Sequence, residues 1–189
     1  MQITRDWLKE KGACGGGVEW FTSKFPEGGE YQDVLDALAH ENLAQWGSWL
    51  LDAAGPTNTV LKIDGDYEAK FGLYFAGRIE ISEFLKVAGH IFSGKGIEAG
   101  SGIKAGSDIK AGWGIEAGWG IEAGEGIKAG EGIKAGWGIK AGEGIKAGSG
   151  YGIFAGLRVK VLAWAKYALV IAKKKPADLI SGEFREKAP

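Results

Sequence analysis

An aliphatic residue recurs at every sixth position through the middle of this chain. From residue 96 to residue 149 the sequence consists of nine consecutive hexads of the form G-I-x-A-G-x, and Asp108 is the one departure at a glycine position. Stepping back in sixes from Ile97 leads to Leu61 through apolar residues alone. Gly150-Tyr151 inserts two residues, after which Ile153 and Val159 resume the phase. The repeat therefore begins in a degenerate form near residue 61 and becomes regular later.

A period of six fits a short strand followed by a corner and does not fit a helix. In Ile-x-Ala the first and third side chains share one face, so we expect both to point inward while the charged residue between them points to water. The Gly-x-Gly that follows would form the corner, with glycine at positive φ. One hexad cannot bury its own isoleucine, whereas stacked hexads can, which predicts a β-solenoid. The regular apolar phase argues against Gly-rich disorder.

The pattern leaves the number of hexads in one coil open between two and three. Along the charged positions from Glu98 to Lys146, opposite charges meet more often at a spacing of two hexads than of three. Because like charges paired across strands are destabilising, this slightly favours two hexads per coil. Familiar left-handed β-helices use three, but their small residue precedes the aliphatic one by two positions, whereas here alanine follows it by two. A tightly turned antiparallel meander is a third arrangement.

Helical patterns precede the repeat and a mixed segment follows it. We expect a first helix capped by Thr4 and stopped by Gly12, a second over 17–25, a third from about Glu30, and a fourth that ends at Gly55-Pro56. After the repeat, residues 158–162 alternate like a strand, and residues 163–172 are compatible with either a strand or a helix.

These patterns together predict an α+β protein in which a small α-helical N-terminal domain precedes a Gly-rich hexapeptide-repeat β-solenoid. The expected divisions are a helical domain over 1–58, the repeat domain over 59–157 and a C-terminal cap with a basic tail over 158–189. Solenoid ends need covering elements, so we expect the flanking segments to cover the ends of the stack.

Composition and charge add two points to this picture. The chain has 34 glycines in 189 residues, against a usual share of about 7%, which the repeat explains. Its formal net charge is −1, yet residues 1–60 carry four Lys/Arg against nine Asp/Glu, and residues 158–189 carry eight against three. An acidic end and a basic end suggest head-to-tail contacts, such as in a homo-oligomer, or a polar partner. We do not expect direct nucleic-acid binding except through Lys173, Lys174 and Lys175.

The sequence offers little material for catalysis or for metal binding. His40 and His90 lie in different regions, and Cys14 is the only cysteine, so neither a metal site nor an intrachain disulfide is expected. The Gly-x-Gly matches come from the repeat and do not indicate a phosphate-binding loop. We therefore expect no enzyme activity and no cofactor.

The N-terminus lacks the apolar region of a signal peptide. The most apolar stretch, 159–172, is too short to span a bilayer and is interrupted by lysines. These features predict a cytoplasmic protein that makes no membrane contact.

The most informative candidates for an interaction surface are the residues between the two glycines of each corner. Corner side chains should project outward, and exposed tryptophan is enriched at binding hot spots. The candidates at these positions are Trp113, Trp119, Trp137, Glu125, Glu131 and Glu143.

The opening segment resembles segments of uncharacterised phage and mobile-element proteins. The resemblance rests on Asp6-Trp7-Leu8, Ala13-Cys14 and residues 18–21 within ITRDWLKEKGACGGGVEWF, and on the later segment QWGSWLL at 45–51. The repeats resemble the Gly-, Ile- and Ala-containing arrays that some of those proteins carry. Such proteins include anti-CRISPR proteins, so the resemblance implies a binding inhibitor whose partner is a host protein or ribonucleoprotein complex of bacterial defence, which it blocks sterically inside the host cell. The repeats also resemble those of bactofilins, which implies a self-assembling scaffold as the alternative.

Overall fold

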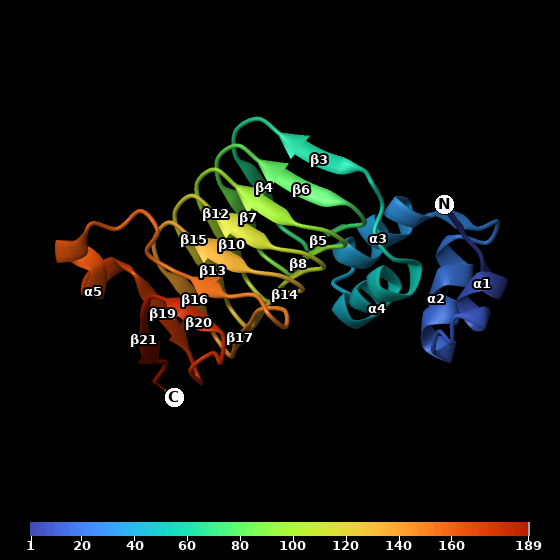
Figure 1. The fold of residues 1–189 in the computed structure, drawn as a ribbon. Coiled ribbons are helices and arrows are strands. Elements are labelled where there is room, and N and C mark those ends of the chain that lie inside the picture. Colours follow the sequence, from blue (N-terminus) through green and yellow to red (C-terminus); the bar gives the residue numbers. More distant parts are fainter. Residues whose placement is uncertain (189) are drawn as a thin grey trace.

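The computed structural model describes residues 1–188 and shows a small helical region followed by a parallel β-solenoid (Figure 1). The helical region contains β1 (Gln2–Ile3), α1 (Arg5–Glu10), α2 (Gly15–Lys24), β2 (Gly29–Glu30), α3 (Tyr31–His40) and α4 (Ala44–Ala54). Thr4 caps α1 as expected, because its Oγ1 accepts a hydrogen bond from the backbone N–H of Trp7 at 3.2 Å. The short antiparallel pair β1–β2 has no counterpart in the helical pattern of the sequence.

The solenoid has three sheets, each built from every third strand of the chain until β20 and β21, which extend two of the sheets at the C-terminal end. The first sheet contains β3 (Val60–Ile63), β6 (Arg78–Ile81), β9 (Ile97–Ala99), β12 (Ile115–Ala117), β15 (Ile133–Ala135), β18 (Ile153–Phe154) and β20 (Leu179–Ser181). The second contains β4 (Tyr67–Ala69), β7 (Leu85–Val87), β10 (Ile103–Ala105), β13 (Ile121–Ala123), β16 (Ile139–Ala141), β19 (Leu169–Ala172) and β21 (Glu183–Glu186). The third contains β5 (Leu73–Phe75), β8 (Ile91–Ser93), β11 (Ile109–Ala111), β14 (Ile127–Ala129) and β17 (Ile145–Lys146).

The register shows that one regular coil contains three hexads. Ile103 pairs with Ile121 in parallel, and every pair within the regular repeat has the same separation. The slight preference for two hexads per coil is therefore wrong, and so is the antiparallel meander. That preference rested on outward charges, and exposed ion pairs are individually weak. Burial decides instead, because three isoleucines from three sides, such as Ile109, Ile115 and Ile121, fill one layer of the interior.

The expected division between inward and outward positions is confirmed in the repeat. All isoleucines from Ile97 to Ile145 are buried, and so are the alanines two positions after them. The residue between them lies on the outer face, as the burial of strands such as β9 and β10 shows. Each coil therefore adds apolar side chains to one continuous core.

The glycines have a different purpose from the one expected. Positive φ occurs at Gly65 and Gly150 but at no glycine of the regular hexads. A Cβ added to Gly124, after the alanine, would overlap the carbonyl oxygen of Gly106 in the preceding coil, and the equivalent glycines behave alike. A Cβ added to Gly120, before the isoleucine, would lie 3.3 Å from the oxygen of Gly138. In the regular hexads the glycine after alanine thus matches the close approach of neighbouring coils, whereas the degenerate coils have Ala76, Ser82 and Ala88 at the equivalent position.

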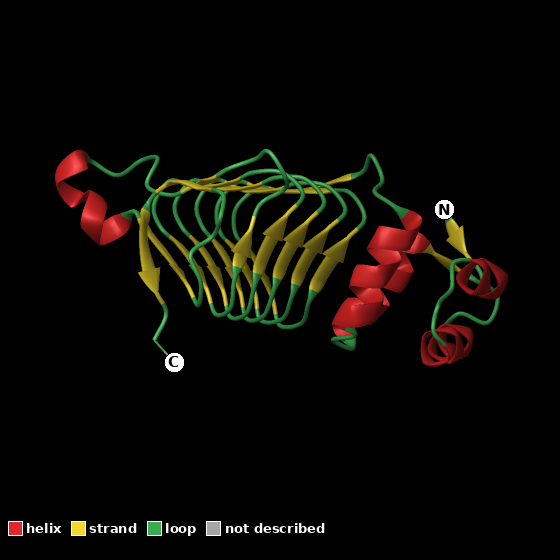
Figure 2. Cartoon of the chain, turned by 60° about the horizontal axis from the view of Figure 1, so that its bottom comes forward, coloured by secondary structure: helices red, strands yellow, loops and turns green. Residues whose placement is uncertain are grey.

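The helical region packs on the outward side of the third sheet near its first strands (Figures 1 and 2). Tyr74 and Phe92 occupy the outward positions of β5 and β8, where most other strands carry a charge, and their rings stack with centroids 4.8 Å apart beneath the helices. Burial raises the pKa of Tyr74 to about 12. Gln32 of α3 donates to the Tyr74 carbonyl at 2.8 Å and accepts from the Ala76 N–H at 3.0 Å. These contacts join the two parts of the chain, and β3 and β4 remain end strands of their sheets.

The chain leaves the coil after β18 and returns at β19 (Figure 2). Gly156, at a φ of 79°, turns the backbone outward into η1 (Val161–Ala163) and α5 (Trp164–Tyr167). The strand expected over 158–162 is wrong, since Leu162 is fully exposed and no strand pairs with it. Val170 takes the place expected for Val159 and pairs with Ile139. The segment 163–172, left open, forms a helical turn and then a strand.

Replacing Ile121 with Asp is expected to destabilise the solenoid strongly, by about 4 kcal/mol or more, because it places an unpaired carboxylate in the apolar core. The outward Lys128→Asp variant is the control and should change stability little. Thermal unfolding followed by circular dichroism measures both. An Ile121→Asp protein that melts like the parent would contradict the stacked core.

Gly124→Ala and Gly120→Ala add the same methyl group directly after and directly before β13, at the two glycine positions of one hexad. The first should lower stability by about 1–3 kcal/mol, because the coils must move apart to admit it. The second should cost less than about 1 kcal/mol, since 3.3 Å needs only a small adjustment. Equal unfolding midpoints in urea would show that close approach does not explain the glycine pattern.

Candidate interaction surface

The corner residues between the two glycines form three ladders along the solenoid. Backbone hydrogen bonds join corner residues three hexads apart, as from the Trp137 N–H to the Trp119 carbonyl at 2.8 Å. The first ladder contains Lys95, Trp113 and Glu131, the second Ser101, Trp119 and Trp137, and the third Ser107, Glu125 and Glu143. The six candidate residues are therefore distributed over three edges of the solenoid.

Trp119 and Trp137 belong to a continuous row of four aromatic side chains, which we call the aromatic ridge. Their rings stack with centroids 5.7 Å apart and planes inclined by 10°. Phe84 meets Trp119 edge-on at 5.4 Å, and Tyr167 lies 5.5 Å from Trp137 at the other end. All four side chains are between 40% and 47% exposed. The ridge thus presents one apolar surface assembled from three distant parts of the sequence.

Trp113 does not join the ridge. It lies on another corner, where the ammonium of Lys95 is 4.9 Å from the centroid of its ring, a cation–π arrangement. Its exposed fraction, 44%, lies between those of the ridge tryptophans, so the two surfaces differ in their neighbours and not in accessibility. Glu131 occupies the next position of this ladder.

Glu125 and Glu143 lie on the third corner. Glu143 forms an ion pair of 2.6 Å with Lys173, the first residue of the basic run in the tail, and the Lys173 N–H donates to the Glu143 carbonyl. Lys174 and Lys175 are exposed. One of the three lysines considered for phosphate contact is thus engaged within the chain.

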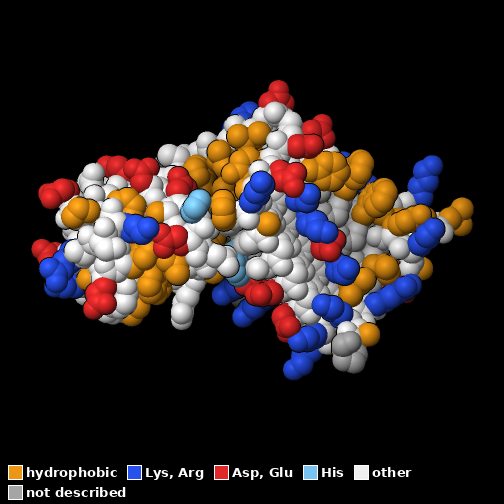
Figure 3. All heavy atoms as spheres, turned by 180° about the vertical axis from the view of Figure 1, so that it is seen from behind, with side chains coloured by type: hydrophobic (Ala, Val, Ile, Leu, Met, Phe, Trp, Pro, Cys, Tyr) orange, Lys and Arg blue, Asp and Glu red, His pale blue; other side chains and the backbone are white. Residues whose placement is uncertain are grey.

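A groove of about 470 Å³ runs beside the aromatic ridge on the outer face of the second sheet, and we call it the basic groove. Its charged lining residues are Lys86, Lys104, Lys140, Lys166 and Glu122. On the face seen in Figure 3, exposed hydrophobic side chains gather over the solenoid next to many Lys and Arg side chains. The surface therefore combines apolar contact area with positive charge.

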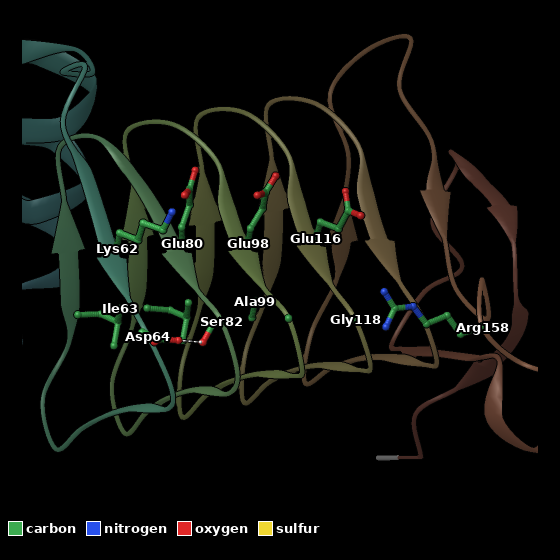
Figure 4. Close-up of a pocket in the computed structure, with 12 residues that line it drawn as sticks. Lys62, Ile63, Asp64, Glu80, Ser82, Glu98, Ala99, Glu116, Gly118 and Arg158 are labelled. Atoms are coloured by element: carbon green, nitrogen blue, oxygen red, sulfur yellow. Dashed lines mark hydrogen bonds between the residues drawn. The ribbon is translucent and has the colours of Figure 1, made fainter.

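A second groove, of about 660 Å³, lies on the first sheet (Figure 4). Glu80, Glu98 and Glu116 follow one another on successive strands and project from the same face, with Arg158 near the C-terminal end. Arg78 forms ion pairs with both Glu80 and Glu98, and its hydrogen bond to Glu98 raises its pKa. Much of this acidic charge is therefore balanced from within the chain.

The helical region has an apolar pocket of about 390 Å³, lined in part by Trp20, Trp46 and Trp49. Cys14, a free and exposed cysteine, stands at its edge as the N-cap residue of α2. Trp20 donates from its indole nitrogen to Glu41 at 2.8 Å, which anchors one wall.

The two histidines make separate local contacts. His40 packs against Phe71 with ring centroids 4.2 Å apart, whereas His90 accepts a hydrogen bond from the Asp108 N–H at 3.2 Å. Within residues 1–188, no three His, Cys, Asp or Glu side chains are grouped so that they could hold a metal ion. In the same residues, no helix has the length and apolar character to cross a bilayer.

Sequence reasoning missed Phe84 and Tyr167 as surface residues. Phe84 stands at the first glycine position of a degenerate hexad, and an aromatic ring at that point was an available signal. Tyr167 reaches the ridge only because the excursion after β18 folds back, which no periodicity in the sequence indicates.

The stack of Trp119 on Trp137 predicts an exciton couplet between the two indoles in circular dichroism. Trp119→Phe or Trp137→Phe should abolish it, and Trp113→Phe should leave it unchanged, because the contact that Trp113 makes is with the ammonium of Lys95 and not with another ring.

Iodide should quench the fluorescence of the unliganded protein strongly, and less after all three replacements, because the three tryptophans are exposed. Complete protection from iodide in the monomer would contradict the exposed ridge.

Comparison with known proteins bears on the helical region alone. No curated protein and no solved structure matches the chain. Residues 1–55, which end where α4 ends and before the solenoid begins, match the family model described as the YdhT N-terminal domain.

Proposed function

We propose that this chain is a non-enzymatic binding protein that occupies the surface of a protein partner through the aromatic ridge. One observation carries the proposal: four exposed aromatic rings form a continuous surface on a rigid repeat. Large aromatic side chains dominate binding hot spots, and contiguous exposed apolar surface is uncommon on proteins without partners. A hydrogen-bonded solenoid also loses little conformational freedom on binding.

In its finer form, the proposal is a phage or mobile-element inhibitor that blocks a bacterial defence complex of the CRISPR type. The resemblance of the opening segment and of the repeats to such proteins supports it, which is an argument by analogy. A steric inhibitor acts in proportion to the complex formed. An enzyme that inactivated the same target would act at far lower ratios.

A self-assembling scaffold is the second candidate, because one end of the stack is incompletely covered. β3 and β4 each have a neighbour on one side only, and Leu61 and Tyr67 at this end are only partly buried. Unpaired strand edges invite pairing with another chain. The final strand β21 instead carries Glu183, Arg185 and Glu186, which discourages such pairing at the other end. We therefore place the scaffold second.

Size against concentration separates the two candidates. Sedimentation velocity should show a small species whose size does not grow as protein concentration rises. Growth into long assemblies would favour the scaffold if the Val60→Lys variant, which places a charge at the open end of the stack, no longer forms them.

The binding proposal predicts that inhibition of a defence complex titrates at about one copy per target site when affinity is tight. The Trp119→Ser/Trp137→Ser variant should weaken binding by at least about 2 kcal/mol, since it removes the centre of the ridge. Trp113→Ser is the matched control on another corner. Full inhibition at a small fraction of an equivalent, increasing with time, would refute steric blocking.

A further inference from the structure

The basic groove differs from the other faces of the solenoid in its charge. Its lining has four lysines and one glutamate. The groove on the first sheet has Lys62 and Arg158 against Asp64, Glu80, Glu98 and Glu116 (Figure 4). Arg78 and Lys134 pair with these three glutamates, so the charge of that face is largely balanced, and the excess of lysine belongs to the face that the aromatic ridge borders.

The acidic groups near the basic groove gather at its N-terminal end. There Lys86 pairs with Glu68 at 2.7 Å, Asp66 accepts from the Phe84 N–H at 3.0 Å, and Glu83 accepts from Ser101 at 2.8 Å. Farther along, Glu122 lies 3.6 Å from Lys104 and 3.9 Å from Lys140, and the ammonium of Lys166 lies 5.0 Å from the centroid of the Tyr167 ring. The positive excess therefore belongs to Lys104, Lys140 and Lys166, which face one lining carboxylate.

The ridge limits what can pack against it. Trp119 and Trp137 stack on each other, and Phe84 and Tyr167 close the two ends of the stack. A nucleic-acid base or a sugar ring binds by stacking on an open aromatic face. Here the two indoles face each other, and Phe84 and Tyr167 contact them from the two ends, so the row suits lateral packing of aliphatic side chains better than insertion of a further ring into the stack.

The groove is long and straight, because its lining residues come from five neighbouring strands of the second sheet: β7, β10, β13, β16 and β19. At about 4.8 Å between strands these cover about 19 Å, the length of roughly six residues of extended polypeptide. A short extended segment therefore matches the groove in length.

We infer that the basic groove receives an extended acidic segment of the partner protein, which is a deeper form of the proposed function and rests on it. Aliphatic side chains of this segment pack on the aromatic ridge. Its alternate carboxylates meet Lys104, Lys140 and Lys86, since successive side chains of an extended segment point in opposite directions. Charge complementarity of this kind sets specificity and the rate of association.

The test uses three probes of similar length: an alternating Glu–Leu peptide, an alternating Lys–Leu peptide and oligothymidylate. Binding to the full chain is followed by tryptophan fluorescence and by protection from iodide. The Glu–Leu peptide should bind and protect, and its affinity should fall as salt is raised. Lys104→Glu/Lys140→Glu should weaken it about tenfold. The neutral pair Lys104→Gln/Lys140→Gln should have a smaller effect in the same direction.

Lys128→Glu, an outward lysine on the third sheet, is the matched control and should leave binding unchanged. Circular dichroism melts show that each variant is folded. Equal binding of the Lys–Leu peptide, preference for oligothymidylate, self-association through the ridge, or no binding of the Glu–Leu peptide would each overturn the inference. The proposed function fails on a different result. It fails if the Trp119→Ser/Trp137→Ser variant inhibits the target complex as well as the parent does.

Discussion

The close approach of successive coils at the corner glycine is the constraint on which the regular part of the solenoid depends. The carbonyl of Gly106 occupies the space that a side chain on Gly124 would need, and this relation repeats along the regular part of the stack. Backbone hydrogen bonds such as that from the Gly124 N–H to the Ala105 carbonyl at 3.1 Å hold the coils at this separation. The other glycine position is less constrained. Asp108 occupies it, and its carboxylate accepts from the Gly126 N–H at 2.8 Å.

This constraint leaves the corner residue free to vary and decides which corner residues meet. Because a coil contains three hexads, side chains combine only when they stand three hexads apart, as Trp119 and Trp137 do. Trp113 precedes Trp119 by one hexad and is therefore carried to another edge. The interior remains uniform because all three sides contribute the same isoleucine and alanine. A surface can thus change by single substitutions without any change in the core.

Local features of this fold could be predicted from sequence, and non-local ones could not. The six-residue period of apolar residues from Leu61 to Ile145 and the helix cap at Thr4 depend on residues close in sequence. The sequence pattern therefore predicted both. The number of hexads per coil depends on how side chains from three sheets fill one interior, whereas the outward charges that we compared contribute little. Tyr74 and Phe92 carried a signal that was available, since both are aromatic at outward positions. The excursion after Gly156 depends on tertiary contacts of Tyr167.

The molecule contains its own comparison for the aromatic ridge. Tyr74 and Phe92 are also an aromatic pair on the outside of the solenoid, stacked on neighbouring coils, with the helices covering them to 0% and 4% exposure. Trp119 and Trp137 form an equivalent stack, yet 47% and 43% of their surfaces remain exposed. Ser101 precedes Trp119 by one coil in the same ladder, so the fold accepts a polar residue at this corner and does not require tryptophan there. Covering the first pair joins the helical region to the solenoid, and the uncovered pair leaves a similar apolar surface open, which is the surface that the proposed function assigns to a partner.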